Sequence, residues 1–191
     1  MTEHAIIFTA ESGRAILAGK KTQTRRVVKF DPDWTADGTP CFDSAGWPLR
    51  EDIYGEFVKV RCPFGVPGDR LWIKEAIHDV GDAIGYEDGT VLPMSNWPWK
   101  RKKLSPLFMP YGASRLTLEV TEVRVQRLKE ISLNDINAEG ISESGTQFID
   151  EHNARGHWAN LWDSINAKRG FGWDKNPFVW ALTFKKVEAK P

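Results

Sequence analysis

The stretch PFVWALTFK occupies residues 177–185 and indicates how the chain folds. Its large apolar side chains stand at every second position: Phe178, Trp180, Leu182 and Phe184. This period is typical of a β-strand, because successive side chains of a strand point to opposite faces. A strand this apolar is expected at the centre of a sheet, where it closes the fold.

Other segments favour strands of the same curved sheet. Residues 116–125 read LTLEVTEVRV, in which apolar and polar residues alternate until the phase shifts near Glu122. One extra residue, a β-bulge, would cause such a shift. Taken together, the patterns predict strands at residues 5–9, 22–28, 70–75, 115–126 and 178–186.

Short helices are expected between these strands. Ser12 can cap a helix that runs to Leu17, and Ser132 with Asp135 forms a capping box for a helix that ends at Gly140. A longer helix carries four large apolar residues on one predicted face: Trp158, Leu161, Trp162 and Ile165. Strands and helices without regular alternation predict an α+β fold with a mostly antiparallel sheet or small barrel.

Two stretches, residues 31–66 and 79–110, are rich in turn-forming residues and show no sustained period. We expect both to be irregular insertions in a single domain that spans residues 1–191, and the first could hold one hairpin. The second contains Trp97-Pro98-Trp99-Lys100-Arg101-Lys102-Lys103, a tight cluster of the aromatic and basic groups that single-strand binding requires. A solvated loop whose tryptophans pack back on the domain is the alternative.

Composition narrows the range of functions. Lys and Arg total 26 and Asp and Glu total 26, so the chain lacks the basic excess of a nonspecific nucleic-acid-coating protein. The two cysteines, Cys41 and Cys62, are far apart, which argues against a zinc site and suits a reducing cytoplasm. No apolar run approaches the roughly 20 residues of a membrane span. We therefore expect a cytoplasmic protein with neither metal nor membrane contact.

Four motifs stand in a fixed order along the chain: GKKTQTRR at 19–26, PGDRLWIKE at 67–75, ISLNDINAEGI at 131–141, and PFVWALTFK at 177–185. This series, with FMPYGASRLTL at 108–118, resembles the ASCH domain of the PUA-like superfamily, especially ASCH-type proteins of bacteriophages and prophages. The resemblance implies a small PUA-like β-barrel with a cleft beside the first helix. Tyr111-Gly112 departs from the phage relatives, which often carry a basic residue and a tryptophan there.

The resemblance also implies an activity. The proposed role of the family is RNA binding, and some small members remove the acetyl group from N4-acetylcytidine without a metal or other cofactor. Their working residues are a lysine and a threonine of a G-x-K-T-x-T motif and a glutamate of a later short helix. These match Lys21, Thr24 and Glu139. The H-x-E and P-C-x-x-C signature of zinc deaminases is missing.

The chemistry of these residue types fits that role. A threonine hydroxyl is a poor nucleophile without a base beside it, and a lysine serves as that base only when burial or neighbouring cations favour its neutral form. The basic run supplies such cations, although most runs of this kind simply face water. Glu139 lies in the last turn of a predicted helix, where the helix dipole disfavours negative charge and so suits an acid.

Substrate contacts are expected from residues near the predicted cleft: Arg25, Arg26, Trp72, Glu75 and Arg115. Alternation places Trp72 on one face of its strand and Glu75 on the other, with apolar neighbours. The first hypothesis is therefore a PUA-like amidohydrolase acting on an acylated nucleoside or its RNA. The alternatives are a non-catalytic RNA- or modified-base-binding module and a phage accessory factor that binds a host protein. The sequence leaves the base, the acyl group and the oligomeric state open.

Overall fold

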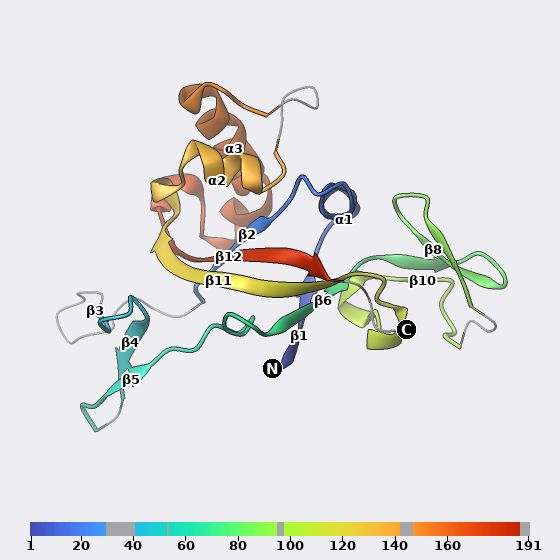
Figure 1. The fold of residues 1–191 in the computed structure, drawn as a ribbon, viewed down its shortest axis with the longest axis horizontal. Helices are drawn as coiled ribbons and strands as arrows, with labels where there is room; N and C mark the ends of the chain where they lie inside the picture. The colour runs from blue at the N-terminus through green and yellow to red at the C-terminus, as the bar shows by residue number, and fades with distance from the viewer. Residues whose placement is uncertain (30–40, 53, 95–97, 142–146, 188–191) are drawn as a thin grey trace. The chain divides into compact units, whose positions relative to one another are not determined.

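The computed structural model describes residues 1–29, 41–52, 54–94, 98–141 and 147–187 (Figure 1). The chain divides into two compact units. Unit 1 comprises Met1–Thr22, Phe64–Thr121 and Phe184–Pro191, and unit 2 comprises Gln23–Pro63 and Glu122–Thr183. No helix of the described ranges is long and apolar enough to cross a membrane. The expectation of one domain over residues 1–191 stays a prediction.

Five strands form one hydrogen-bonded sheet in the order β1-β6-β11-β12-β2. Their bounds are Glu3–Ile7 for β1, Arg70–Lys74 for β6, Thr117–Arg127 for β11, Phe178–Val187 for β12 and Gln23–Val27 for β2. The pair β1–β6 is parallel, whereas β6–β11 and β2–β12 are antiparallel. The five predicted strands and the α+β class with a mostly antiparallel sheet are thus confirmed.

Along these strands, buried side chains that face the core alternate with more exposed side chains. Leu71 and Ile73 of β6 are fully buried, while the other residues of the strand are half-buried. On β11 the alternation breaks at Thr121 and Glu122, which are both exposed, at the position where the sequence predicts a bulge. Along β12, four consecutive residues are buried: Val179, Trp180, Ala181 and Leu182. This strand is therefore covered on both faces, as a central strand must be.

The first helix, α1, spans Ala10–Leu17 in unit 1 and begins earlier than predicted. Its N-cap is Thr9, whose side chain accepts the backbone N–H of Ser12. Thr9 has the extended backbone that an N-cap needs, so Ser12, the predicted cap, lies inside the first turn. The helix ends before Gly19, whose φ of +69° is favourable only for glycine.

The segment predicted as irregular at 79–110 contributes to a four-stranded antiparallel sheet in unit 1. Its strands are β7 (Ile77–Asp79), β8 (Ala83–Tyr86), β9 (Val91–Pro93) and β10 (Lys103–Leu104), and two short 3-10 helices follow, η1 (Pro106–Phe108) and η2 (Tyr111–Ala113). The prediction was wrong because these strands have two to four residues, too few to show a period. Their core includes Tyr86, Met109 and the partly buried Trp99.

The segment predicted as irregular at 31–66 likewise carries a three-stranded sheet in unit 2. Its strands are β3 (Cys41–Phe42), β4 (Pro48–Glu51) and β5 (Phe57–Lys59), while the part at 31–40 lies outside the described residues. Two aspartates close its turns. Asp43 accepts the backbone N–H groups of Ala45 and Trp47, and Asp52 accepts those of Tyr54 and Glu56. Turns that a side chain stabilises involve only neighbouring residues, so strand periodicity in the sequence does not reveal them.

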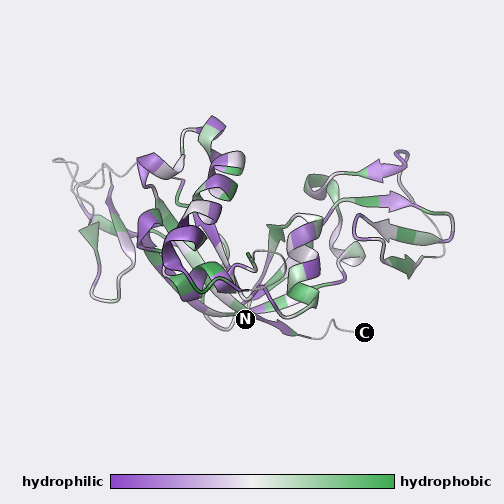
Figure 2. Ribbon diagram, turned by 90° about the horizontal axis from the view of Figure 1, so that it is seen from above, coloured by the Kyte–Doolittle hydropathy of each residue, from purple (hydrophilic) through white to green (hydrophobic). Residues whose placement is uncertain are grey.

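Unit 2 also holds the remaining helices, which carry both hydrophilic and hydrophobic residues (Figure 2). These are α2 (Leu133–Ala138), α3 (Glu151–Asn166) and three 3-10 helices, η3 (Leu128–Glu130), η4 (Ala167–Arg169) and η5 (Trp173–Lys175). The predicted capping box of Ser132 and Asp135 is confirmed, and α2 ends at the C-cap Glu139, followed by Gly140 with φ +76°.

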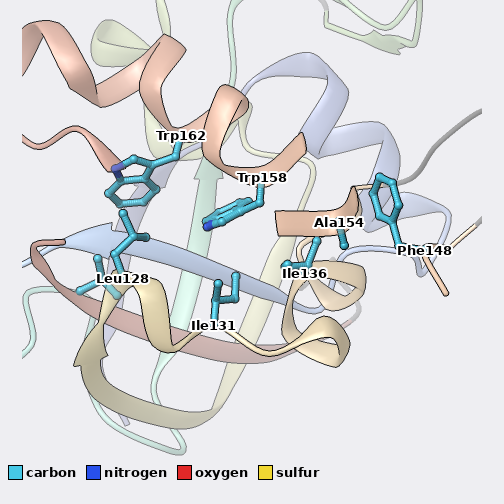
Figure 3. Close-up of a cluster of buried hydrophobic side chains, with 8 residues drawn as sticks. Leu128, Ile131, Ile136, Phe148, Ala154, Trp158 and Trp162 are labelled. Carbon is cyan, nitrogen blue, oxygen red and sulfur yellow. The ribbon is translucent and has the colours of Figure 1, made fainter. Parts of the chain in front are cut away.

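Helix α3 covers a core around Trp158 and Trp162, with Leu128, Ile131 and Ile136 beneath it (Figure 3). The prediction that Leu161 and Ile165 share this buried face was wrong, because they are 40 % and 54 % exposed. The buried residues of α3 follow one row at intervals of four: Ala154, Trp158, Trp162 and Asn166. In a helix of 3.6 residues per turn, each step of four residues rotates this row by about 40° around the helix axis. Toward the end of α3, the other apolar residues therefore point away from the core.

Candidate functional site

Buried polar residues are concentrated in two of the four sequence motifs. Nine polar or charged residues are buried among those that the structure describes: Lys21, Gln23, Thr24, Arg25, Asp69, Glu75, Asp135, Glu139 and Asn166. Six of the nine come from residues 21–25 and from helix α2 with its C-cap. Burying a polar group is costly unless it is paired, so this concentration marks the candidate site.

Arg25 is the centre of the site in unit 2. Its side chain is 0 % exposed, and its Nη1 donates to Glu139 Oε1 at 3.1 Å and to Gln23 Oε1 at 3.2 Å. Its Nη2 forms an ion pair with Asp135 Oδ2 at 2.9 Å. One guanidinium of strand β2 therefore binds two carboxylates of one helix, which leaves its charge compensated inside the fold.

The charges around Asp135 determine how it titrates. Burial alone would raise the pKa of Asp135, but the positive charge of Arg25, a hydrogen bond from Gln23, the cap at Ser132 and the charge of Arg124 lower it below its ordinary value. The Arg124 Nη2 atom donates to Asp135 Oδ1 at 3.2 Å. Asp135 is thus held as a carboxylate with several donors around it.

Thr24 and Arg26 occupy the other face of β2. Thr24 is 2 % exposed and pairs in register with Leu182, whereas Arg25 pairs with Ala181. Successive residues of a strand point to opposite faces, so Thr24 and Arg26 share one face of β2 and Arg25, which donates to Glu139, lies on the other. Arg26 is half-buried, and burial lowers its pKa, an effect that the charge of Glu139 opposes.

Lys21 belongs to unit 1 and is 7 % exposed, while Lys20 beside it is exposed. The left-handed Gly19 ends α1, and the backbone N–H groups of both lysines then donate to Ala15 O. The Lys21 Nζ atom lies 5.8 Å from the centroid of the Phe8 ring. The end of the helix therefore turns the lysine side chain inward, toward an aromatic ring.

Glu75 and Arg115, two predicted substrate contacts, pair with each other in unit 1. Arg115 Nε donates to Glu75 Oε2 at 2.8 Å and its Nη2 to Glu75 Oε1 at 2.7 Å. Its Nη1 and Nη2 also donate to Asp88, at 3.2 and 2.6 Å. Its guanidinium carbon lies 4.1 Å from the centroid of the Tyr86 ring. The structure thus engages Arg115 in a buried network of one cation and two carboxylates.

The network has clear electrostatic and steric consequences. Burial would raise the pKa of Asp88, but hydrogen bonds from Arg115 and from Thr90 hold it at about 2. Burial raises the pKa of Tyr86 to about 12, against the charge of Arg115. A Cβ at Gly13 would lie 2.6 Å from Glu75 Oε1, so a larger residue there would displace a carboxylate that Arg115 holds in place.

Trp72, another predicted substrate contact, lies on the half-buried face of β6, opposite to Leu71 and Ile73. Its ring meets Tyr111 edge-on at 5.4 Å, and Lys74 Nζ lies 5.3 Å from its centroid. The structure therefore places Trp72 in an aromatic and basic group of its own, formed with Tyr111 and Lys74.

The basic run at Lys100–Lys103 is exposed along its whole length. Trp99 packs against the core of the four-stranded sheet, as the alternative interpretation expected, and Trp97 lies outside the described residues. Lys103 Nζ forms an exposed ion pair with Glu87 at 2.9 Å. All four cations of the run are on the surface, where they can meet an anionic partner.

We expect replacement of Lys100, Arg101, Lys102 and Lys103 by alanine to weaken binding of single-stranded RNA, because fewer phosphates are neutralised. The slope of affinity against salt concentration should also flatten. Fluorescence anisotropy with a labelled oligonucleotide at several salt concentrations measures both effects. The variant Lys185→Ala/Lys186→Ala, which removes exposed cations of β12, is the control. Unchanged affinity in the four-residue variant would show that this run takes no part in RNA binding.

Three charged partners of the site were not predicted from the sequence. Asp88 and Arg124 carry no motif, and Asp135 was recognised only as a helix cap. The spacing of Asp135 and Glu139, four residues apart on one helix, is a signal that could have placed both carboxylates on one face. Among the described residues, no group of three or more His, Cys, Asp or Glu side chains could hold a metal ion.

No family model and no curated protein matches the chain. Among solved structures, the chain is similar to a protein from Enterococcus faecalis V583, assigned to the family DUF984, with 10 % identity over 98 % of this chain and 82 % of that chain, at a TM-score of 0.46. It is also similar to an ASCH domain from Lactobacillus crispatus JV V101, with 13 % identity over 98 % and 81 % of the two chains, at a TM-score of 0.42.

Proposed function

We propose that this chain is a metal-independent amidohydrolase that removes an acyl group from the exocyclic amine of a nucleoside, free or within RNA. The observation that carries this proposal is the burial of all three residues of the predicted trio, Lys21, Thr24 and Glu139, at 7 %, 2 % and 5 % exposure. Lysine and glutamate are rarely buried without a reason. Withdrawal from water is also what a lysine base and a threonine nucleophile require.

The reaction assigns one task to each residue. The neutral amine of Lys21 takes the proton of the Thr24 hydroxyl, or of a water bound to it, and the resulting oxygen attacks the acyl carbon. Arg26, which shares the face of β2 with Thr24, stabilises the negative oxygen of the tetrahedral intermediate. The bond from carbon to nitrogen then breaks, and protonated Glu139 or Lys21 donates a proton to the departing amine. If Thr24 attacks directly, a water hydrolyses the acyl-threonine in a second step.

One observation favours a second candidate function. Glu139 accepts a hydrogen bond from the buried guanidinium of Arg25, which fixes the position of its carboxyl group. A fixed carboxylate recognises the amino group of a base by accepting its hydrogen bond, without any reaction. The alternative is therefore a module that binds RNA or a modified base and does not turn it over.

Incubating the purified chain with N4-acetylcytidine and a panel of other N-acylated nucleosides decides between the two. Chromatography with mass detection should show the free nucleoside and the released acid in equal amounts. Thr24→Val keeps the shape of the side chain and should abolish turnover, whereas Thr22→Val, at an exposed position two residues earlier, should retain it. Binding of the nucleosides without turnover would establish the binding module, and full activity of Thr24→Val would refute the mechanism.

A further inference from the structure

Helix α2 brings two carboxylates to one guanidinium. Asp135 and Glu139 are four residues apart, so they lie one above the other on the same side of the helix. Asp135 Oδ2 lies 2.9 Å from Arg25 Nη2, and Glu139 Oε1 lies 3.1 Å from Arg25 Nη1. Two like charges at this spacing repel each other unless a cation lies between them. Arg25 is that cation, and its position depends on both.

Asp135 is anchored by donors other than Arg25. It belongs to the capping box with Ser132, and it accepts a hydrogen bond from Arg124 Nη2 at 3.2 Å. Glu139 is the C-cap of the same helix, directly before the left-handed Gly140. A helix of only six residues has little stability of its own. The anchors of Asp135 therefore help to fix the place of α2 beside the guanidinium.

We infer that Asp135 is a positioning residue, which orients Glu139 by fixing the Arg25 guanidinium that both carboxylates share. This role deepens the proposed function, on which it rests. Asp135 does not touch the substrate. It determines where the guanidinium lies, and the guanidinium determines where Glu139 Oε1 lies. Without the charge of Asp135, the guanidinium of Arg25 can move together with Glu139. The carboxyl group of Glu139 is then no longer held in one place when the leaving amine needs its proton.

The kinetic test compares Asp135→Asn with Ser132→Ala, which removes the other half of the capping box and leaves Arg25 untouched. Asp135→Asn should lower kcat on N4-acetylcytidine by about tenfold or more with little change in KM, because the acid and not the binding is misplaced. Ser132→Ala should lower thermal stability and leave both constants unchanged. In a Glu139→Gln background, Asp135→Asn should have no further effect, since it acts only through that residue.

A second measurement needs no activity. Removal of one carboxylate leaves Arg25 paired with the other, but removal of both leaves a buried cation without an anion. The fall in Tm of the double variant Asp135→Asn/Glu139→Gln should therefore exceed the sum of the two single falls. The matched double variant Ser132→Ala/Glu139→Gln should be additive, because the Ser132 hydroxyl accepts from the backbone N–H of Asp135 and the Arg25–Asp135 pair remains.

The outcomes separate this inference from the proposed function. An excess fall in Tm supports the shared guanidinium even if no nucleoside is hydrolysed, in which case only the proposed reaction fails. Additive changes in Tm would overturn the inference. A wild-type kcat in Asp135→Asn, or an equal loss in Ser132→Ala, would overturn it as well.

Discussion

Replacement of Arg115 by methionine is expected to lower the free energy of unfolding by about 3–5 kcal/mol. The substitution keeps much of the length and apolar contact of the side chain above Tyr86, but it removes the only positive charge that the structure shows between Glu75 and Asp88. Both carboxylates are 3 % exposed, so water cannot take the place of the guanidinium. Denaturant unfolding followed by circular dichroism measures the loss.

The control for this prediction is Lys103→Met, which breaks the ion pair with Glu87. Their side chains are 65 % and 43 % exposed, and pairs of this kind contribute about 0–1 kcal/mol. If the two variants lost equal stability, burial would not explain the strength of the Arg115 network.

Gly13→Ala should also destabilise the fold, because the added Cβ would clash with Glu75 Oε1 of the same network.

The same network should contribute to acid unfolding. The pKa of Asp88 falls from an ordinary 3.8 to about 2 in the folded chain. A carboxyl whose pKa is depressed by folding stabilises the fold fully above its unfolded value, and this stability is lost as the pH falls from about 3.8 toward 2. In Arg115→Met that protection should be reduced, so unfolding should begin at a higher pH than in the wild type.

Replacement of Lys21 by methionine is expected to lower turnover of an acylated nucleoside by at least about 100-fold, the smallest contribution typical of a general base. Methionine keeps a long apolar stem against Phe8 but has no amine to accept the threonine proton. The folded state should persist, because the ring contact is retained and a polar amine is no longer withdrawn from water. Steady-state kinetics with a circular dichroism spectrum of each variant tests both statements.

Lys20→Met is the matched control for this prediction. Lys20 precedes Lys21, carries the same charge and is exposed, so its loss should leave turnover close to the wild-type level. Equal losses in the two variants would mean that the run acts through its total charge, as in binding of an anionic substrate. Full activity of Lys21→Met would refute the role of Lys21 as the base.

Local signals explain why part of the fold could be predicted. The alternation at Phe178–Phe184 concerns neighbours along one strand, and the capping box at Ser132 concerns residues three apart. The short strands between Cys41 and Lys59 could not be located from the sequence. Strands of two to four residues are stabilised by turns and by neighbours on the adjacent strand, and neither produces a period along the chain. Leu161 and Ile165 were misplaced because periodicity shows which side of a helix is apolar, not where along its length the core ends.

The sequence by itself determined the α+β class, the five main strands and the residue types gathered in residues 19–26 and 131–141. Only the tertiary structure decided which buried charges pair. Arg25 and Glu139 are 114 positions apart, and Arg115 is 40 positions from Glu75 and 27 from Asp88. The physical reason is that an ion pair depends on the distance between two charges in a medium of low polarity. No local pattern in the chain records that distance, because the packing of the strands and helices creates it.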